Sequence, residues 1–144
     1  MQYSRIAWIA LILTSAGANV SAAVPVEISA TTPDMTGSRF VFALKERIRS
    51  SKSLELTFDQ GKPRFQVQIV TLNPNGGSDS HSTVYSVVIT WKSPDAPFPL
   101  YITSYVGVVG GANVKDGADG VAAAISEQAD SIERATHNGA QRQP

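Results

Sequence analysis

The sequence contains no cysteine among its 144 residues. Without thiols the chain cannot form disulfide bonds, iron–sulfur clusters, thiolate zinc sites or a cysteine nucleophile, and it offers no cysteine for lipid attachment. An excess of one charge is also missing, because 12 basic and 12 acidic residues balance to a formal charge of zero. A neutral chain lacks the basic surface of a nucleic-acid-binding protein, so we expect no such partner. The 42% of hydrophobic residues is typical of a folded protein, and the length favours one domain.

Residues that carry catalysis or bind cofactors are also scarce. The two histidines are His81 and His137, and Asp79 is the carboxylate nearest to His81, which is an incomplete ligand set for a metal. The loop around His81 holds serines, but a catalytic triad needs its groups on separate supports. The glycines at 107–111 do not have dinucleotide-binding spacing, and Lys115 lacks the hydroxyl neighbour of a phosphate-binding loop. We therefore expect no cofactor, no metal and no enzyme activity.

The first residues have the layout of a secretory signal peptide. Arg5 precedes an apolar run at 6–13, and small residues follow at 14–18 and up to an expected cleavage site after Ala22 or Ala23. So short a run does not span the roughly 30 Å of a bilayer's hydrocarbon core, so we expect cleavage and no stable membrane anchor afterwards. Export without cysteine suits a bacterial periplasm, and we expect a periplasmic or secreted protein.

Two periodicities divide the rest of the chain. Apolar and polar residues alternate over about 24–30, 54–58, 65–72, 84–91 and 100–108, which predicts five strands. Helical spacing over about 37–51 and 117–136 predicts two amphipathic helices. Asp34 or Thr36 is expected to cap the first helix and Asp116 the second, and Asn138-Gly139 is expected to end the second.

The order β-α-β-β-β-β-α predicts an α+β fold, a two-layer sandwich with two helices on one face of a mainly antiparallel sheet of about five strands. Turn residues at 59–63 predict a hairpin between the second and third strands within an antiparallel meander of four. We expect a single domain at 24–136 between a signal peptide at 1–23 and a disordered tail at 137–144. The expected core comprises Phe40, Leu44, Ile48, Phe65, Val67, Ile69, Val87, Ile89, Trp91, Ile102, Val106, Val121, Ile125 and Ile132.

The sheet face away from the helices is the first candidate for function. Uncharged faces that bear tyrosine are typical of binding surfaces, although strand propensity alone also enriches threonine and tyrosine on a solvated sheet. The candidate interaction face comprises Gln66, Gln68, Val88, Thr90, Tyr101, Thr103 and Tyr105, with Val70, Leu72 and Ser86 expected on the same side.

A polar loop at 73–82 is the second candidate. Its candidate interaction residues are Asn75, Gly76, Gly77, Asp79 and His81. Two functions remain open from these surfaces. The first is a non-catalytic binding or envelope-assembly module, whose partner is another envelope protein or a second copy of the chain. The second is an inhibitor or immunity-type protein that blocks a secreted hydrolase with the loop. A small enzyme without a recognisable motif is a third, weaker alternative.

Part of the chain resembles a group of bacterial envelope modules. The stretch FVFALKERIRSS at 40–51, followed by Leu54-Glu55-Leu56, is similar to the helix-then-strand segment of such modules. The amino-terminal domain of the Tol-system propeller protein and the lipopolysaccharide-assembly lipoprotein have this two-helix, one-sheet plan. The stretch YSVVITW at 85–91 resembles small exported proteins of unknown function from Gram-negative bacteria. The resemblance implies an envelope role and supplies no functional residue, and this chain lacks the lipidated cysteine of the lipoproteins.

Overall fold

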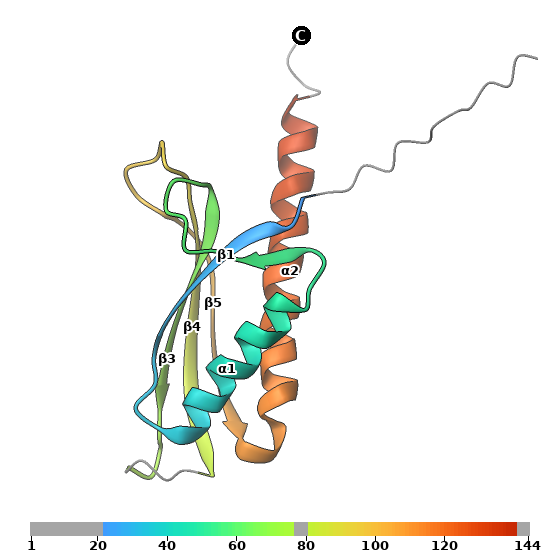
Figure 1. Ribbon diagram of the computed structural model, residues 1–144. Coiled ribbons are helices and arrows are strands. Elements are labelled where there is room, and N and C mark those ends of the chain that lie inside the picture. The colour runs from blue at the N-terminus through green and yellow to red at the C-terminus, as the bar shows by residue number, and fades with distance from the viewer. Residues whose placement is uncertain (1–21, 77–80, 141–144) are drawn as a thin grey trace, which may run out of the picture.

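The element order is the predicted one in a computed structural model that describes residues 22–76 and 81–140 (Figure 1). The expected signal segment therefore lies almost entirely outside the described residues, as do 141–144. The elements are β1 (Val24–Thr31), α1 (Met35–Arg49), β2 (Leu54–Leu56), β3 (Arg64–Leu72), β4 (Ser82–Lys92), β5 (Leu100–Gly110), a single 3-10 turn η1 (Gly111–Asn113) and α2 (Val114–Ala140).

The strands form one mixed five-stranded sheet in the order β2-β1-β3-β4-β5, which confirms the predicted α+β class. The predicted hairpin between β2 and β3 is wrong, because β1 lies between them and runs parallel to both. β2 pairs with the start of β1, at Val24 to Val26, and β3 pairs with β1 from Val26 onward. The segment 57–63 therefore crosses β1 instead of reversing the chain, and the antiparallel meander comprises three strands.

The start of α1 is fixed to the sheet by a buried aspartate. Asp34 caps the helix, and its Oδ1 accepts a 2.7 Å hydrogen bond from the Gly37 amide. Its Oδ2 accepts 3.0 Å hydrogen bonds from the hydroxyls of Thr71 on β3 and Thr83 on β4. A side chain at position 37 would start 2.1 Å from Thr71 Oγ1, so this close approach requires glycine. Asp34 thus joins one helix and two strands at a single carboxylate.

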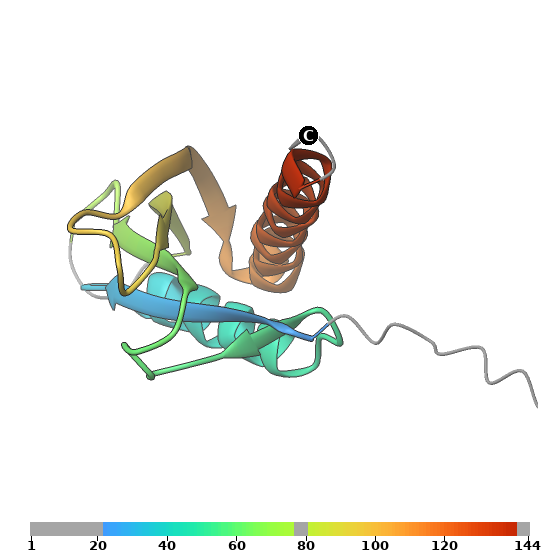
Figure 2. The same cartoon turned by 90° about the horizontal axis from the view of Figure 1, so that it is seen from above.

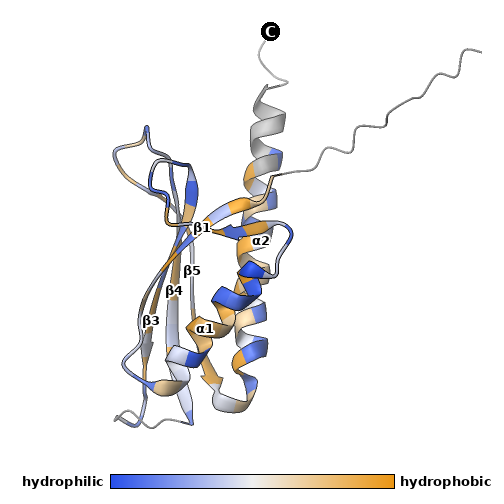
Figure 3. Ribbon diagram, viewed as in Figure 1, coloured by the Kyte–Doolittle hydropathy of each residue, from blue (hydrophilic) through white to orange (hydrophobic). Residues whose placement is uncertain are grey.

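Both helices lie on one side of the sheet, and α2 packs chiefly on α1 (Figure 2). Hydrophobic and hydrophilic residues are interspersed along α1 and along the coloured part of α2 (Figure 3). The 3.0 Å ion pair between Arg47 and Asp119 joins their outer surfaces.

The ends of α2 differ from the sequence expectation. The helix begins at Val114, so Asp116 lies in its first turn and does not cap it. There the negative charge of Asp116 interacts favourably with the positive end of the helix dipole. It continues past Asn138-Gly139 to Ala140, so the expected tail at 137–144 is helical as far as it is described. One glycine inside a helix costs only about 1 kcal/mol and need not end it. No helix within the described residues is long and apolar enough to cross a membrane.

The core lies between the sheet and the helices and matches most of the expected residues. Trp91, Ile102 and Ile132 are partly buried against it. The prediction that Val106 belongs to the core is wrong, since 77% of this residue is exposed. The expected residues that are buried are Phe40, Leu44, Ile48, Phe65, Val67, Ile69, Val87, Ile89, Val121 and Ile125, and Val26, Val41, Leu54, Val109, Val114, Ala118, Ala122 and Ala129 join them.

A β-bulge explains the error at Val106. Ile89 pairs with Thr103 whereas the next residue, Thr90, pairs with Tyr101, so Ile102 is an extra residue in β5. One extra residue reverses the alternation of side chains for the rest of the strand. Beyond the bulge Val106 therefore faces away from the helices.

Candidate interaction surface

The sheet face opposite the helices, here called the helix-free face, includes four cross-strand rows on β3, β4 and β5, three of which continue onto β1 at Glu27, Ser29 and Thr31. Side chains in one row are direct neighbours, because paired residues of adjacent strands point to the same side. The rows are Leu72–Val84–Val108, Val70–Ser86–Val106, Gln68–Val88–Ser104 and Gln66–Thr90–Tyr101.

Five of the seven candidate face residues lie together on this face. Thr103 and Tyr105 do not, because the bulge at Ile102 turns them to the side that bears the helices. There Tyr105 is partly buried against the core. The confirmed positions on the helix-free face are Gln66, Gln68, Val88, Thr90 and Tyr101.

The first two rows form an apolar end, defined here as Val70, Leu72, Val84, Val106 and Val108. Val106 is 77% exposed and Leu72 is 62% exposed, and Val70 and Val108 are also exposed. Because these residues come from three adjacent strands, they make one continuous patch. Alternation predicted Val70 and Leu72 on this side. It placed Val106 and Val108 on the opposite side, because it did not include the bulge.

The opposite, polar end is closed by its own hydrogen bonds. Arg64 is buried and its Nε lies 2.5 Å from Glu27 Oε2 on β1. Arg64 Nη1 also donates to the carbonyls of Gln60 and Lys62 at 3.1 and 3.3 Å. Gln66 Nε2 donates to the same Glu27 oxygen at 3.1 Å. The hydrogen bonds from Arg64 and Gln66 outweigh partial burial and lower the pKa of Glu27.

The candidate loop begins at the apolar end, directly after Leu72. Asn73 is buried, its Nδ2 donates to the Gly76 carbonyl at 2.7 Å, and its Oδ1 accepts from the Asn75 amide at 2.9 Å. This asparagine turn is completed by Gly76, whose φ of 71° favours glycine. Asn75 and Gly76 are exposed as a result of the turn.

The loop also returns at the apolar end. His81 is exposed, and its carbonyl accepts a 2.8 Å hydrogen bond from the Gly111 amide just after β5. Gly77 and Asp79 lie outside the described residues. The structure therefore brings the described part of the candidate loop next to the apolar end. Leu72 is beside the loop in the sequence, but Val106 and Val108 come close to it only through the fold.

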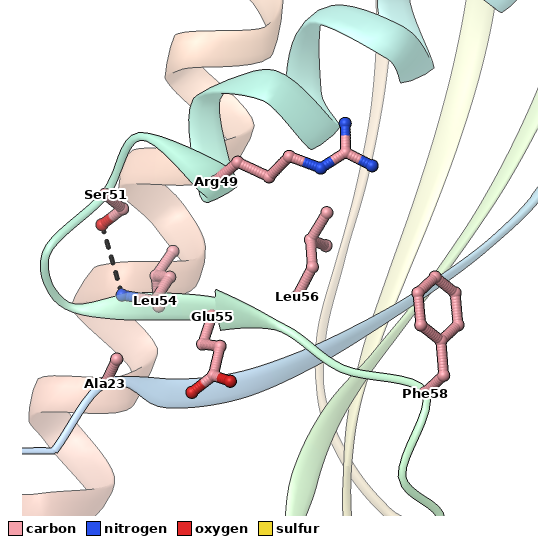
Figure 4. A pocket seen from close by; sticks show the side chains of 7 residues that line it. All are labelled: Ala23, Arg49, Ser51, Leu54, Glu55, Leu56 and Phe58. Carbon is pink, nitrogen blue, oxygen red and sulfur yellow. Dashed lines mark hydrogen bonds between the residues drawn. The ribbon is translucent and has the colours of Figure 1, made fainter.

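A separate hollow of about 400 Å³ lies beside β2, at the other edge of the sheet. Figure 4 shows the Arg49 side chain and the Phe58 ring on either side of Leu56, with Glu55 pointing to the opposite side of the strand. Phe58 was expected to continue the strand, but β2 ends at Leu56 and the ring is 85% exposed.

A second hollow, of about 440 Å³, lies between the two helices beside the exposed ring of Phe42. The Arg47–Asp119 ion pair lines it, together with Lys115 and Glu46. The four charged side chains balance in sign, so this hollow has no preference for a ligand of one charge.

The described residues contain no group of three or more histidine, aspartate or glutamate side chains placed to hold a metal ion. Their buried side-chain nitrogen and oxygen atoms all have hydrogen-bond partners. The apolar end is a group of adjacent and mostly exposed apolar side chains on the described sheet. A scan against protein-family models and a search of curated proteins found no match to this sequence.

Proposed function

We propose that this protein is a non-catalytic binding module of the bacterial envelope that recognises a protein partner through the apolar end of its helix-free face. The observation that carries the proposal is the exposure of Val70 and Leu72 on β3 and of Val106 and Val108 on β5, with the half-buried Val84 and Ser86 of β4 between them. Contiguous exposed apolar patches on a folded protein commonly mark interaction sites.

The magnitudes support a binding role. Burying a valine or leucine side chain contributes about 1.5–3 kcal/mol when it is completely withdrawn from water. Association of two proteins costs at least about 4 kcal/mol in lost freedom of motion. Several adjacent side chains are therefore needed to give net affinity, and the apolar end supplies them without any charge that a partner must neutralise.

The proposed location rests on the N-terminal pattern, in which Arg5 and the apolar run at 6–13 precede small residues. Mass spectrometry of the protein recovered from an envelope fraction tests this location. A mature chain beginning at Ala23 or Val24 is expected. Recovery of a chain that retains residues 1–21 would contradict cleavage.

Two matched variants test the surface. Val70→Lys places a charge in the apolar end, and Gln68→Lys places the same charge on the same strand and face in the adjacent row. Partners captured from an envelope extract are identified, purified and titrated against each variant. We expect Val70→Lys to weaken binding at least about tenfold, since a buried unpaired charge is costly, and Gln68→Lys to change it little. Equal affinity of both variants would refute the surface.

The alternative function is an inhibitor that inserts its loop into the cleft of a secreted hydrolase. The asparagine turn favours it, because Asn73 holds Asn75 and Gly76 in a fixed, exposed conformation. Deleting 77–80 should abolish binding under this alternative and spare it under the first. Val70→Lys should give the reverse result, so the two variants together separate the alternatives.

A further inference from the structure

β5 forms one edge of the sheet and has a free side. Within the described residues it pairs with β4, and the sheet order ends at β5. Seen from above, α2 stands beside β5 on the helix-bearing side, and no described strand pairs with β5 on the side away from β4 (Figure 2). An edge strand presents a row of unpaired backbone N–H and C=O groups that can pair with another strand.

The two edges of this sheet are protected very differently. β2 has three residues, including the charged Glu55, so it offers little template for pairing. β5 has eleven residues, LYITSYVGVVG, without a charge or a proline. Natural edge strands are usually kept from pairing by shortness, by charge, by proline or by a bulge. β5 has only the bulge at Ile102, and its residues 103–110 have none of these protections.

We propose that β5 pairs antiparallel with β5 of a second copy, which joins two five-stranded sheets into one across a twofold axis. This inference goes beyond the proposed binding function, because it concerns the edge of β5 and adds self-association to the binding of another protein at the apolar end. A twofold axis perpendicular to the sheet places directly opposed residues on the same face, so both copies carry their helices on the same side. Val106 and Val108 of one copy then lie beside those of the other, and the two apolar ends merge.

Charge favours a second copy over another strand as the occupant. Self-pairing of an uncharged strand brings no like charges opposite one another, whereas like charges would be destabilising. A partner strand with charged residues would find no opposite charge along β5. A second copy also supplies a free strand of matching length. Residues 103–110, beyond the bulge, pair with β4 without interruption and provide a regular stretch for this contact.

The oligomeric state of two matched variants tests the proposal. Val106 and Val70 lie in the same row of the helix-free face, with Ser86 between them, so Val106→Lys and Val70→Lys differ in their distance from the free edge. Sedimentation of the purified protein over a range of concentrations should show a dimer. We expect Val106→Lys to raise the dimer dissociation constant at least about tenfold, and Val70→Lys to change it less than about twofold.

Crosslinking locates the contact, and the absence of native cysteine makes single-cysteine variants unambiguous. Ser104→Cys, Val106→Cys and Val108→Cys lie on β5, and Gln68→Cys lies on the same face of an inner strand. A short bis-maleimide reaches both direct and diagonal neighbours in adjacent strands, which are within about 8 Å. The β5 variants should form covalent dimers in high yield and Gln68→Cys should not.

Three results would overturn the proposal. They are a monomer at every concentration, a dimer that survives Val106→Lys, and a dimer that Val70→Lys disrupts equally, which would indicate face-to-face packing. None of these depends on the envelope-partner titration, in which Val70→Lys alone is compared with Gln68→Lys. Failure of self-pairing is therefore distinguishable from failure of the proposed binding function. Circular dichroism of each variant confirms that a lost dimer does not reflect lost folding.

Discussion

The two ends of the sheet each hold one carboxylate that accepts several hydrogen bonds, but on opposite faces. At the polar end Glu27 lies on the helix-free face, where Arg64 and Gln66 surround it. At the apolar end Asp34 lies beneath the sheet, where Thr71 and Thr83 donate to it. The carboxylate and the threonine hydroxyls at the apolar end are thus turned inward, and its outer surface carries mainly valine and leucine, with Ser86 between Val70 and Val106. The polar groups at one end of the sheet therefore bond to one another within the chain. The apolar side chains at the other end can gain stability when a partner covers them.

The largest expected effect on stability follows from removing the Asp34 carboxylate, here called the inner anchor. Asp34→Ala leaves the Gly37 amide and the Thr71 and Thr83 hydroxyls without their buried acceptor. An unsatisfied buried polar group costs about 1–3 kcal/mol, so the free energy of unfolding should fall by about 3 kcal/mol or more. Urea denaturation measures the loss. A loss below about 1 kcal/mol would show that water replaces the carboxylate and that the anchor is dispensable.

Glu27 with its partner Arg64 is here called the outer anchor. Removing it should lower the free energy of unfolding by less. Arg64→Met keeps much of the aliphatic stem but leaves Glu27 without its buried cation. Because Glu27 remains partly exposed, water compensates, and we expect a loss of about 1–2 kcal/mol. Glu27→Gln with Arg64→Met should recover part of this loss, as a double-mutant cycle in urea would measure. A cycle with no coupling energy would contradict the role of this pair.

Acid should weaken both ends. Burial raises the pKa of Asp34, but hydrogen bonds from the Gly37 amide and from Thr83 and Thr71 outweigh it and hold the pKa below its ordinary value. The pKa of Glu27 is lowered as well. A carboxyl whose pKa is lower in the folded state stabilises the fold above its ordinary pKa, and this contribution is lost as the pH falls through the folded-state pKa. Stability should therefore decline below about pH 4.

Two single variants assign the acid effect to one end or the other. Asp34→Asn should remove the part of the acid-induced loss of stability that comes from the inner anchor. Glu27→Gln should remove the part that comes from the outer anchor. Thermal unfolding recorded between neutral and acid pH provides the comparison. An unchanged pH profile in both variants would mean that other carboxyl groups cause the acid sensitivity.

The smallest effect is expected on the apolar end itself. Leu72→Thr removes an exposed apolar side chain from the helix-free face and keeps strand propensity. Exposed substitutions usually change stability by less than about 0.5 kcal/mol, and we expect this one to do the same. The melting temperature at low protein concentration measures it. A loss above about 1 kcal/mol would show that Leu72 serves the fold and would weaken the contrast between the two ends.

Local periodicity was sufficient to predict the element order, because alternation and helical spacing depend on near neighbours. It failed at β5, where Leu100, Ile102, Val106 and Val108 keep the same spacing through the bulge, with only Ser104 out of the pattern, and apolar residues occur on both faces. No local signal marks Ile102 as the extra residue. The assignment of residues to the helix-free face was therefore right for β3 and β4, as at Gln68 and Val88, and wrong for Thr103 and Tyr105.

Contacts between distant parts of the chain were the other limit. Asp34 was recognisable as a helix cap, but Thr71 and Thr83 lie 37 and 49 residues farther along the chain. The position of β1 between β2 and β3 is likewise a long-range pairing, whereas turn residues at 59–63 favoured a local hairpin. Parallel pairing is determined by tertiary packing, and the sequence near each strand does not specify it.

The position of β1 between β2 and β3 has a consequence for how the sheet is assembled. β1 is the first strand to be synthesised, and its two neighbours β2 and β3 follow it in the chain. β3, β4 and β5 are then each added to the growing edge in the order in which they are made. A chain that emerges from its amino terminus can therefore build this sheet stepwise, without inserting a late strand between two that are already paired. The strand made last, β5, is also the one whose outer side stays open when synthesis ends.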